Sequence, residues 1–439
     1  MSRPTDLAGW LAHLESRNRD AIVLGLERVR TVADRLGLKP ACPVITVGGT
    51  NGKGSVCAYL EAMLVAAGLR VGCYTSPHLL YYNERVRIDG HALEDGALCE
   101  AFEAVEVARG DIPLTYFEQG TLAALWCFGR TPLDVLVLEV GMGGRLDAVN
   151  LWDPDCAIVT SVDLDHQAFL GDTREAIGFE KAGIYRPGRP AICGDASPPA
   201  SLIRHATEIG ARLMEADKAF CWAVQDAAWT LWINAGQDTD ADVYPALPMP
   251  AMAGHHQLGN AACAIAALHT LRSRLPVSRQ ALRLGLTTAR QPGRFQVVGQ
   301  TPLRILDVAH NPHAARSLAA NLAHLQKRLE SRQAPFGKII AVLALLADKD
   351  ADGVIQPLLP LVGRWHTAGL AGPRGRPGAE LAELLTARGA RAEAHDTVLE
   401  AWQEACREAG AADTICAFGS FHTVAELLTD IQAAPSHHG

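Results

Sequence analysis

The sequence contains no C-x-x-C pair, although it has eleven cysteines. These cysteines are odd in number and scattered along the chain, so they indicate neither a disulfide framework nor a zinc ribbon. We expect most of them to be buried thiols in a reducing compartment. The sequence also lacks a block of lysine and arginine residues, and its formal net charge is -8. Both features argue against nucleic-acid binding, although a local basic site for an anionic substrate stays open.

Long apolar segments are missing as well. The longest uninterrupted apolar run, residues 339–347, is too short to cross a bilayer. Residues 1–6 lead into a polar amphipathic helix. We therefore expect a cytoplasmic protein without a membrane partner. No internal repeat or low-complexity tract is evident, and 439 residues with 49% hydrophobic content predict two or three domains with large cores.

A glycine-rich loop at residues 47–55, VGGTNGKGS, is the most informative feature that is present. It stands between an apolar run at residues 42–47, which predicts a buried strand, and a helical pattern that ends at Gly68. Glycines allow backbone N–H groups to surround an anion, the helix N-terminus adds positive charge, and Lys53 can reach terminal phosphates. The Walker pattern is matched imperfectly, because a valine replaces its first glycine and a glycine separates the lysine from the serine. The loop predicts nucleotide phosphate binding, with a simple helix-entry turn as the alternative.

Strand-like runs alternate with helical patterns through much of the chain, which predicts parallel sheets covered by helices. The clearest runs are residues 134–140, 156–162, 190–193, 304–308, 339–346 and 414–418. The predicted fold class is α/β, with a P-loop ATPase-like N-terminal domain that has a parallel-rich sheet, and a smaller Rossmann-like C-terminal domain. A breaker at residues 291–295 places the boundary near residue 297. Residues 222–232 and 238–250 indicate a β-rich or looped insertion late in the first domain.

Several further motifs follow the glycine loop in order. They are residues 75–79 (TSPHL), 83–86 (NERV), 139–150 (EVGMGGRLDAVN), 165–166 (DH), 180–184 (EKAGI), 293–295 (GRF), 307–312 (DVAHNP) and 419–424 (GSFHTV). Together with the GTNGKGS loop they closely resemble folylpolyglutamate synthase of the Mur ligase superfamily, in its bacterial form that also acts as dihydrofolate synthase. The resemblance extends from about residue 20 to about residue 430.

This resemblance implies an ATP-dependent carboxylate-amine ligase of folate biosynthesis and one-carbon metabolism. Such an enzyme adds L-glutamate to dihydropteroate, which yields dihydrofolate, and to reduced folates, which yields polyglutamates. The resemblance also implies ATP and Mg²⁺ as cofactors, with two ions, and a monomer. It assigns residues 1–296 to the ATP-binding central domain with the folate site, and residues 297–439 to the C-terminal glutamate-ligase domain.

The same resemblance assigns roles to individual residues. The expected ATP contacts are Thr50, Asn51, Gly52, Lys53, Gly54, Ser55, Asn260, Arg294 and Asp307. The expected magnesium ligands are Ser76, Glu139 and His166. The expected folate contacts are Thr115, Tyr116, Phe117, Glu118, Leu146, Asp147 and Ala148. Lys53, Lys181 and His310 are expected to act in catalysis, with Lys181 carried as a carbamate.

The chemistry of ligation suits these residue types. A carboxylate is a poor electrophile, so ATP must convert it to an acyl phosphate before an amine attacks, while the protein positions groups and neutralises charge. Oxygen ligands suit Mg²⁺, which favours Ser55, Ser76 and Glu139. His166 fits less well because magnesium prefers oxygen to imidazole, and its residue type is equally consistent with a base or a phosphate contact. Near magnesium a cationic ammonium is disfavoured, so the amine of Lys181 is more easily neutral. Reaction of this amine with carbon dioxide would turn it into an anion.

Two segments of the first domain also have a purely structural interpretation. Residues 115–118 combine two aromatic rings with a carboxylate, which could stack on a pterin and accept its amino protons. The same residues could instead be a helix start packed on the core. Glu139, a single acid at the end of an apolar run, could cap the glycine turn that follows it.

Four other positions leave alternatives open in the same way. Asn260 could be a helix N-cap, Arg294 a surface charge in the linker, and Asp307 the cap of the next helix. Lys181 could form a solvated helix pair with Glu180.

Two other functions share part of this sequence pattern. A muramyl-peptide ligase, or another Mur-type amino-acid ligase, uses the same acyl phosphate chemistry. A muramyl-peptide ligase should carry an additional N-terminal domain, for which the fifty or so residues before the glycine loop leave no room. An ATP-gated binding or scaffold protein would close on nucleotide without making a bond. The lysine and the acidic residues argue against it, and glutamate-dependent ADP release would distinguish the two.

Overall fold

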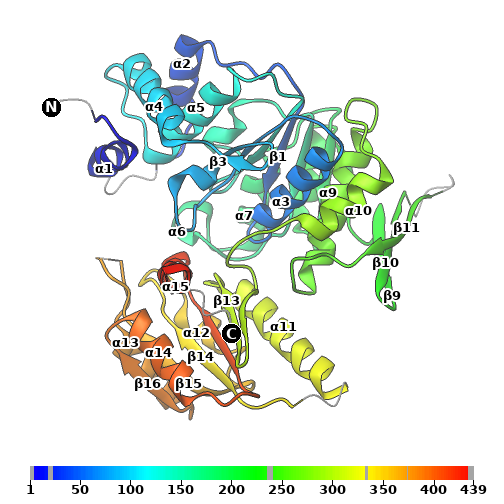
Figure 1. Cartoon of the computed structure of the whole chain (residues 1–439). Coiled ribbons are helices and arrows are strands. Elements are labelled where there is room, and N and C mark those ends of the chain that lie inside the picture. Colours follow the sequence, from blue (N-terminus) through cyan, green and yellow to red (C-terminus); the bar gives the residue numbers. More distant parts are fainter. Residues whose placement is uncertain (1–3, 18–22, 235–240, 332–334, 373, 434–439) are drawn as a thin grey trace. The chain divides into compact units, whose positions relative to one another are not determined.

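The computed structural model describes residues 4–17, 23–234, 241–331, 335–372 and 374–433. The chain forms two compact units, each with its own sheet (Figure 1). Unit 1 comprises Met1–Ala251 and Gln257–Arg290, and unit 2 comprises Met252–His256 and Gln291–Gly439. The division at Gln291 lies a few residues before the boundary expected near 297. The segment Met252–His256 groups with unit 2, which the sequence did not indicate.

Unit 1 is built on a mostly parallel sheet with the strand order β4-β3-β2-β5-β1-β6-β7-β8. The bounds are β1 Val44–Gly48, β2 Val71–Tyr74, β3 Val86–Ile88, β4 His91–Ala92, β5 Val135–Glu139, β6 Cys156–Val159, β7 Pro190–Cys193 and β8 Arg212–Glu215. Strands β2, β5, β1, β6, β7 and β8 are parallel, whereas β3 and β4 form an antiparallel edge. The strands predicted at residues 134–140, 156–162 and 190–193 correspond to β5, β6 and β7.

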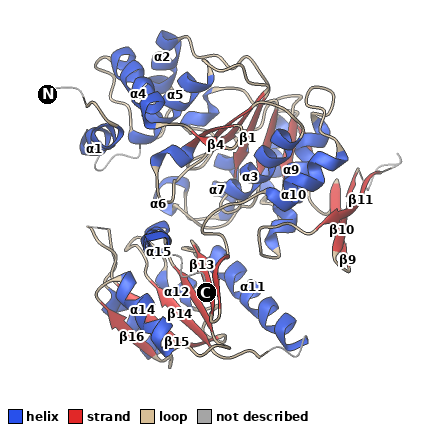
Figure 2. Cartoon of the chain, in the orientation of Figure 1, coloured by secondary structure: helices blue, strands red, loops and turns tan. Residues whose placement is uncertain are grey.

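Helices cover both faces of the unit 1 sheet (Figure 2). Their bounds are α1 Leu7–Arg17, α2 Glu27–Leu36, α3 Lys53–Ala66, α4 Asp95–Arg109, α5 Tyr116–Phe128, α6 Gln167–Leu170, α7 Arg174–Ala182, α8 Ala200–Glu208, α9 His256–Thr270 and α10 Arg279–Thr288, with 3₁₀ turns η1 Tyr82–Arg85 and η2 Ala148–Leu151. Helices α4, α5, α7 and α8 contribute apolar side chains to the clusters on one face, and α3 and α10 pack together. Strands β1, β5 and β6 are buried over their whole length because both faces of the sheet are covered there.

The insertion predicted to be β-rich or looped is a three-stranded antiparallel sheet. It consists of β9 Phe220–Gln225, β10 Ala228–Ile233 and β11 Asp242–Pro248. Residues of β10 alternate between buried and half-buried, as expected for a strand with one face toward a core. Residues 238–240 of the predicted insertion lie outside the described part of the chain.

Unit 2 is a second α/β layer structure with the strand order β12-β13-β17-β14-β15-β16. Its strands are β12 Gln296–Gln300, β13 Leu303–Asp307, β14 Ile339–Leu343, β15 Val362–Ala368, β16 Ala392–His395 and β17 Thr414–Phe418. Its helices are α11 Pro312–Ser331, α12 Ala351–Ile355, α13 Gly378–Ala387, α14 Val398–Glu408 and α15 Phe421–Ala433. All strand pairs are parallel except β12 with β13. The predicted α/β class, with parallel-rich sheets in two domains, is therefore confirmed.

The expectations from composition can be compared with this structure. The eleven cysteines are free thiols, and most of them are buried. Among the described residues, no helix is both long enough and apolar enough to cross a membrane.

The contact between α3 and α10 depends on a glycine, which makes a stability test possible. A Cβ atom at Gly285 would lie 2.7 Å from Met63 N and 2.8 Å from Met63 Cα, closer than these atoms can approach. We expect Gly285→Ala to lower the free energy of unfolding by about 1–3 kcal/mol, because α10 must move away from α3. Gly96 is the control, since nothing lies within 4 Å of its Cβ position in α4. Gly96→Ala should stabilise the protein by about 0.5–1 kcal/mol in urea unfolding, and equal effects of both substitutions would contradict the close packing.

Candidate functional site

The carboxyl ends of β5, β1 and β6 are neighbours in the unit 1 sheet, and the loops that follow them line one small hollow. We call it the unit 1 hollow; its lining residues are Gly49, Thr50, Lys53, Val140, Gly141, Met142, Gly143, Asp165, His166, Leu170 and Lys181. Ligand sites of parallel α/β sheets form at this edge. The fold thus brings the glycine loop, the glycine turn after Glu139, the Asp165-His166 pair and Lys181 to one place.

The glycine loop is held against the loop that follows β6. Thr50 N donates to Ser161 O at 2.8 Å, and the Thr50 hydroxyl donates to Asp163 O at 3.1 Å. Gly49 has φ 142°, and a Cβ there would collide with the Thr160 side chain. The loop therefore needs glycine at this position, both for its backbone angle and for its close contact with the neighbouring loop.

Lys53 begins helix α3, and its side chain folds over the loop. Its Nζ donates to Gly49 O at 3.1 Å and to Thr50 O at 3.3 Å. Gly52 precedes the helix with a left-handed φ of 87°, and no side chain caps the helix. The first N–H groups of α3 are thus left for another acceptor, which is the arrangement that favours an anion.

Asn260 packs directly on this helix start. A Cβ at Gly52 would lie 2.6 Å from Asn260 Oδ1. Asn260 Nδ2 donates to Gln257 Oε1 at 3.1 Å, and Gln257 Nε2 donates to Ser55 Oγ at 3.3 Å. Asn260 lies inside α9, so the alternative that it is an N-cap is wrong. Sequence reasoning missed Gln257, although its spacing of three residues from Asn260 on a helix was a usable signal.

Glu139 ends β5 as a buried carboxylate beside the loop after β2. Its Oε2 accepts a hydrogen bond from Ser76 N at 3.1 Å. This contact places Ser76, which carries a hydroxyl group, next to a carboxylate where two parallel strands end. Oxygen donors of this kind suit Mg²⁺ or Mn²⁺. His166, the third predicted ligand, lines the unit 1 hollow with a left-handed φ of 52° and an exposed side chain.

Lys181 is buried in the last turn of α7, with 4% of its surface exposed. Burial, and next the positive charge of Lys53, lowers its pKa to about 7. Its neighbour Glu180 pairs instead with Arg145, with Arg145 Nη2 2.8 Å from Glu180 Oε1. The alternative of a solvated Glu180–Lys181 pair is therefore wrong. At pH 7 a lysine with this pKa is about half neutral, and its neutral amine can act as a nucleophile, whereas a surface lysine is almost fully protonated.

Asp147 is fully buried behind the glycine turn. Its carboxylate accepts from Met142 N at 2.9 Å and from Val149 N at 3.0 Å, so it fixes that turn and begins η2. Burial raises the pKa of Asp147 to about 6, while hydrogen bonds from these N–H groups oppose the shift. Ala148 is buried in the apolar cluster to which α4 and α5 contribute, and Leu146 is half-buried.

The segment predicted to bind a pterin forms the start of α5. Thr115 and Glu118 form a capping box, with Glu118 N donating to Thr115 Oγ1 at 3.2 Å and Thr115 N donating to Glu118 Oε2 at 2.7 Å. Glu118 Oε1 accepts from Arg28 at 2.8 Å. Glu118 is thus engaged in structure at both oxygens, as the helix-start interpretation expected. The sequence gave no local signal for Arg28, because it lies ninety residues away from Glu118.

The aromatic rings of this segment differ in position. Phe117 lies against the glycine turn, since a Cβ at Gly141 would be 2.6 Å from its ring. Tyr116 lies farther round the helix start, where the Arg85 guanidinium is 5.6 Å from its ring centre. Phe117 therefore connects α5 to the unit 1 hollow, which Gly141 lines.

The predicted residues of unit 2 also form a group. Asp307 is buried at the end of β13 and accepts from Phe295 N and Ala309 N, each at 2.8 Å. Burial raises its pKa, and the positive charge of Arg294 opposes that shift. The Arg294 guanidinium lies 5.7 Å from the centre of the Phe421 ring, and His310 lies 6.0 Å from the same ring.

The helix that follows β13 corrects one alternative. Asn311, not Asp307, caps α11, because Ala314 N donates to Asn311 Oδ1 at 2.9 Å. Arg294 is half-buried against Phe421 and is not a surface charge. Arg294, Asp307 and His310 are thus brought together within unit 2, while the other predicted site residues belong to unit 1.

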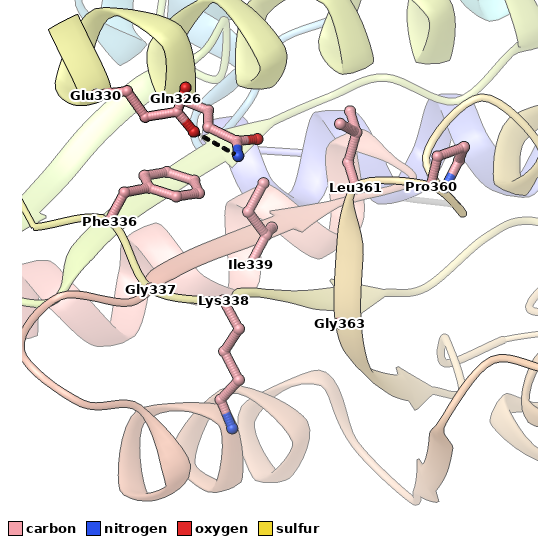
Figure 3. Close-up of a pocket in the computed structure, with 9 residues that line it drawn as sticks. All are labelled: Gln326, Glu330, Phe336, Gly337, Lys338, Ile339, Pro360, Leu361 and Gly363. Atoms are coloured by element: carbon pink, nitrogen blue, oxygen red, sulfur yellow. Dashed lines mark hydrogen bonds between the residues drawn. The ribbon is translucent and has the colours of Figure 1, made fainter.

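A larger hollow in unit 2, about 460 Å³, lies at the amino end of β14 (Figure 3), whereas Asp307 lies at the carboxyl end of β13. It is bordered by α11 and by the amino end of β14, where Gln326 donates to Glu330 at 3.0 Å. The Lys338 side chain points away from the other labelled side chains (Figure 3), and its Nζ donates to Glu408 Oε1 of α14 at 2.6 Å. Since it includes none of the predicted site residues, size alone does not make it the functional site.

Comparisons with known proteins agree with this geometry. A profile described as Mur ligase, glutamate ligase domain, matches residues 293–421. The dihydrofolate synthase/folylpolyglutamate synthase of Escherichia coli (strain K12) is 46% identical over 431 residues, which cover 98% of this chain and 96% of that protein. The chain belongs to the dihydrofolate synthase/folylpolyglutamate synthase family.

Solved structures of this family have the same fold. One is E. coli FolC in complex with DHPP and ADP, with a TM-score of 0.90, 46% identity and 98% of both chains covered. Another is the bifunctional enzyme of Yersinia pestis with AMPPNP and a Mn ion, with a TM-score of 0.89, 46% identity, and 98% of this chain and 100% of that chain covered. The expected family and the ATP-dependent ligase activity are confirmed. The roles of single residues stay predictions.

The buried position of Lys181 predicts an unusual pH dependence of stability. Its folded-state pKa of about 7 lies below the ordinary 10.5, so the unfolded chain binds more protons between these values. Lys181 destabilises the fold fully below pH 7, and this effect fades as the pH rises toward 10.5. In bicarbonate-free buffer, the gap in unfolding free energy between Lys181→Met and wild type should shrink by about 1.4 kcal/mol per pH unit in that window. A gap that is constant with pH, as expected for the exposed control Lys39→Met, would contradict the prediction.

Proposed function

We propose that this chain uses ATP to join L-glutamate to dihydropteroate and to reduced folates, through an acyl phosphate of the substrate carboxylate. The observation that carries the proposal is the unit 1 hollow, where an uncapped helix start and Lys53 occur together with a buried Lys181 whose pKa is lowered. The first arrangement suits the phosphates of a nucleotide, and the second suits an active site from which water is excluded. The family's own names and complexes support the choice of substrates.

Each part of the glycine loop has a role in this proposal. Thr50 and Asn51 hold the loop against Ser161 through their backbone N–H groups. The backbone N–H groups of Gly52 and Gly54 would face the phosphate chain, and Lys53 leaves the loop carbonyls to neutralise the transferred phosphate. Ser55 and Asn260, linked through Gln257, keep the start of α3 in place. Within unit 2, Arg294 and Asp307 are the proposed ATP contacts, and His310 is the proposed catalytic residue.

A divalent ion would be held by Ser76, Glu139 and His166. A second ion is expected because the resemblance to the family implies two. A bound Mg²⁺ supplies positive charge that stabilises the phosphates during transfer. Glu139 fits this role because its carboxylate is buried and directed by Ser76 N. His166 fits Mn²⁺ better than Mg²⁺, since an imidazole nitrogen is a softer ligand.

Lys181 would be carried as a carbamate. Its neutral Nζ attacks carbon dioxide and releases a proton, which turns a buried cation into an anion. This anion offsets the charge of Lys53 and removes the like-charge contact that lowers the pKa of Lys181. The structure supports the first requirement, a neutral amine.

The folate site would lie between α5 and η2. Phe117 contacts the glycine turn and offers a ring for stacking, while Thr115, Tyr116 and Glu118 shape the start of α5. Leu146, Asp147 and Ala148 form the opposite side in this proposal. Glu118 and Asp147 each accept hydrogen bonds from protein donors at both oxygens, so in this proposal they hold the two sides of the site in place.

One purified protein should therefore carry both activities. We expect labelled glutamate to be incorporated with either dihydropteroate or tetrahydrofolate, and each reaction should require ATP and a divalent ion. Incorporation with tetrahydrofolate alone would contradict the synthase half of the proposal. Glutamate-independent ADP release would favour the binding-protein alternative.

Lys53→Ala tests the lysine of the glycine loop in this assay, with Lys39→Ala as the matched control. It should lower both activities by at least about 100-fold, or about 3 kcal/mol in the barrier, at saturating ATP. Lys39→Ala removes an exposed lysine of the same unit and should leave both rates unchanged.

Lys181→Ala tests the carbamate. We expect a folded protein with almost no activity, because the anion is missing, and partial recovery when acetate supplies a carboxylate. Acetate should not restore the activity of Lys53→Ala, since that variant lacks a cation and not a carboxylate. Full activity of Lys181→Ala without acetate would exclude a carbamate in the reaction.

A further inference from the structure

Unit 2 carries a cluster of metal-ligating side chains at the edge of its sheet, apart from every residue discussed so far. His366 lies on β15, and Glu393 and His395 lie on the edge strand β16. One ligand atom from each of the three lies within 4.8 Å of the others. The strand register places His366 beside Glu393, and His395 follows two residues later, so all three share one face of the sheet.

The ring of His366 is fully buried and is held at both nitrogens. Its Nδ1 lies 2.9 Å from His395 Nε2, and its Nε2 lies 3.2 Å from Glu408 Oε2 on α14. Glu408 pairs with both Lys338 and Arg364, so this carboxylate is ionised and can only accept. His366 Nε2 must then carry the proton. Its Nδ1 presents a lone pair toward His395.

The lone pair of His366 Nδ1 is directed along the contact with His395, where a metal ion would meet both rings. A carboxylate that fixes a histidine from behind is the usual support of a histidine ligand in metal sites.

We propose that His366, His395 and Glu393 bind a divalent transition-metal cation of the Zn²⁺ class, with Glu408 as a positioning residue. Two nitrogens on one tetrahedral zinc ion, each at about 2.0–2.1 Å, lie about 3.3 Å apart. The two imidazoles need little movement from their present 2.9 Å to admit the ion between them. Two imidazoles and one carboxylate select zinc-class ions over Mg²⁺.

Glu393 is the ligand that must move. In this structure it pairs with Arg364, which also contacts Glu408. Glu393 is half-exposed on an edge strand, with 49% of its side chain accessible, so it has room to turn toward the ion. Arg364 then keeps Glu408 as its partner. The bound ion would connect the four-residue strand β16 to β15, and water would complete its coordination.

The test is zinc binding to the full-length, metal-stripped protein, measured by competition with a chromogenic chelator in excess Mg²⁺. We expect the wild-type protein to bind one zinc ion per chain. In both His395→Gln and Glu393→Gln the affinity for zinc should be at least about 100-fold weaker, so that this ion is lost. Glu408→Gln keeps a hydrogen-bond acceptor and should weaken binding by about 10–100-fold, the effect typical of a residue behind a ligand. Substitution of Co²⁺ for zinc should give the same visible spectrum in Glu408→Gln as in wild type.

His324→Gln is the matched control, since it removes an exposed histidine of α11 in the same unit. It should bind zinc as tightly as wild type. Glu393→Gln changes an exposed side chain and keeps the claim testable if His395→Gln unfolds. Equal zinc affinity in wild type and Glu393→Gln, or a zinc ion retained by thiols in every variant, would overturn the proposal and leave a hydrogen-bonded histidine pair.

Discussion

Two lysines at one small hollow, Lys53 and Lys181, are the constraint on which the unit 1 site depends. Burial and the charge of Lys53 together make a cationic Lys181 unfavourable, while Asp165 and Asp147 oppose this only in part. An anion bound near two like charges of this kind would reduce their repulsion. Both proposed occupants, the phosphates of ATP and the carbamate on Lys181, supply negative charge to that place.

The sheet places these lysines accurately because its central strands are buried on both faces. Strands β2, β5, β1 and β6 are neighbours, so the loops after them meet at one edge although they lie far apart in sequence. Small residues then bring the loops into contact: Gly49 against Thr160, Gly52 against Asn260, and Gly141 against Phe117. Any Cβ atom at these glycines would separate elements that the site needs together.

Much of this arrangement could be predicted from sequence, because its signals are local. An apolar run, a glycine loop and a helical pattern around Lys53 are adjacent in the chain, so β1, the loop and α3 were expected where they occur. Burial of Lys181 could not be derived from residue order, since the pattern also suited a solvated pair with Glu180. Its environment comes from the packing of α7 on the glycine turn, where a Cβ at Gly144 would meet the backbone of α7.

Other features depend on contacts between distant segments and left no local pattern. Arg28 reaches Glu118, Gln257 reaches Ser55, and His366 reaches His395 across neighbouring strands. The cap of α11 is Asn311 and not the expected Asp307. Only the structure shows which side chain accepts from Ala314 N. Sequence patterns thus indicated the strand ends and their chemistry, whereas the partners of each side chain required the fold.

The central claim is that ATP activates the substrate carboxylate at this site. The most direct measurement uses dihydropteroate with ¹⁸O in its carboxylate, together with ATP, a divalent ion and L-glutamate, and follows the isotope in the released phosphate. An acyl phosphate transfers one carboxylate oxygen to phosphate, so we predict one ¹⁸O atom in each phosphate released. Phosphate without ¹⁸O, formed while the new amide bond is made, would contradict the account.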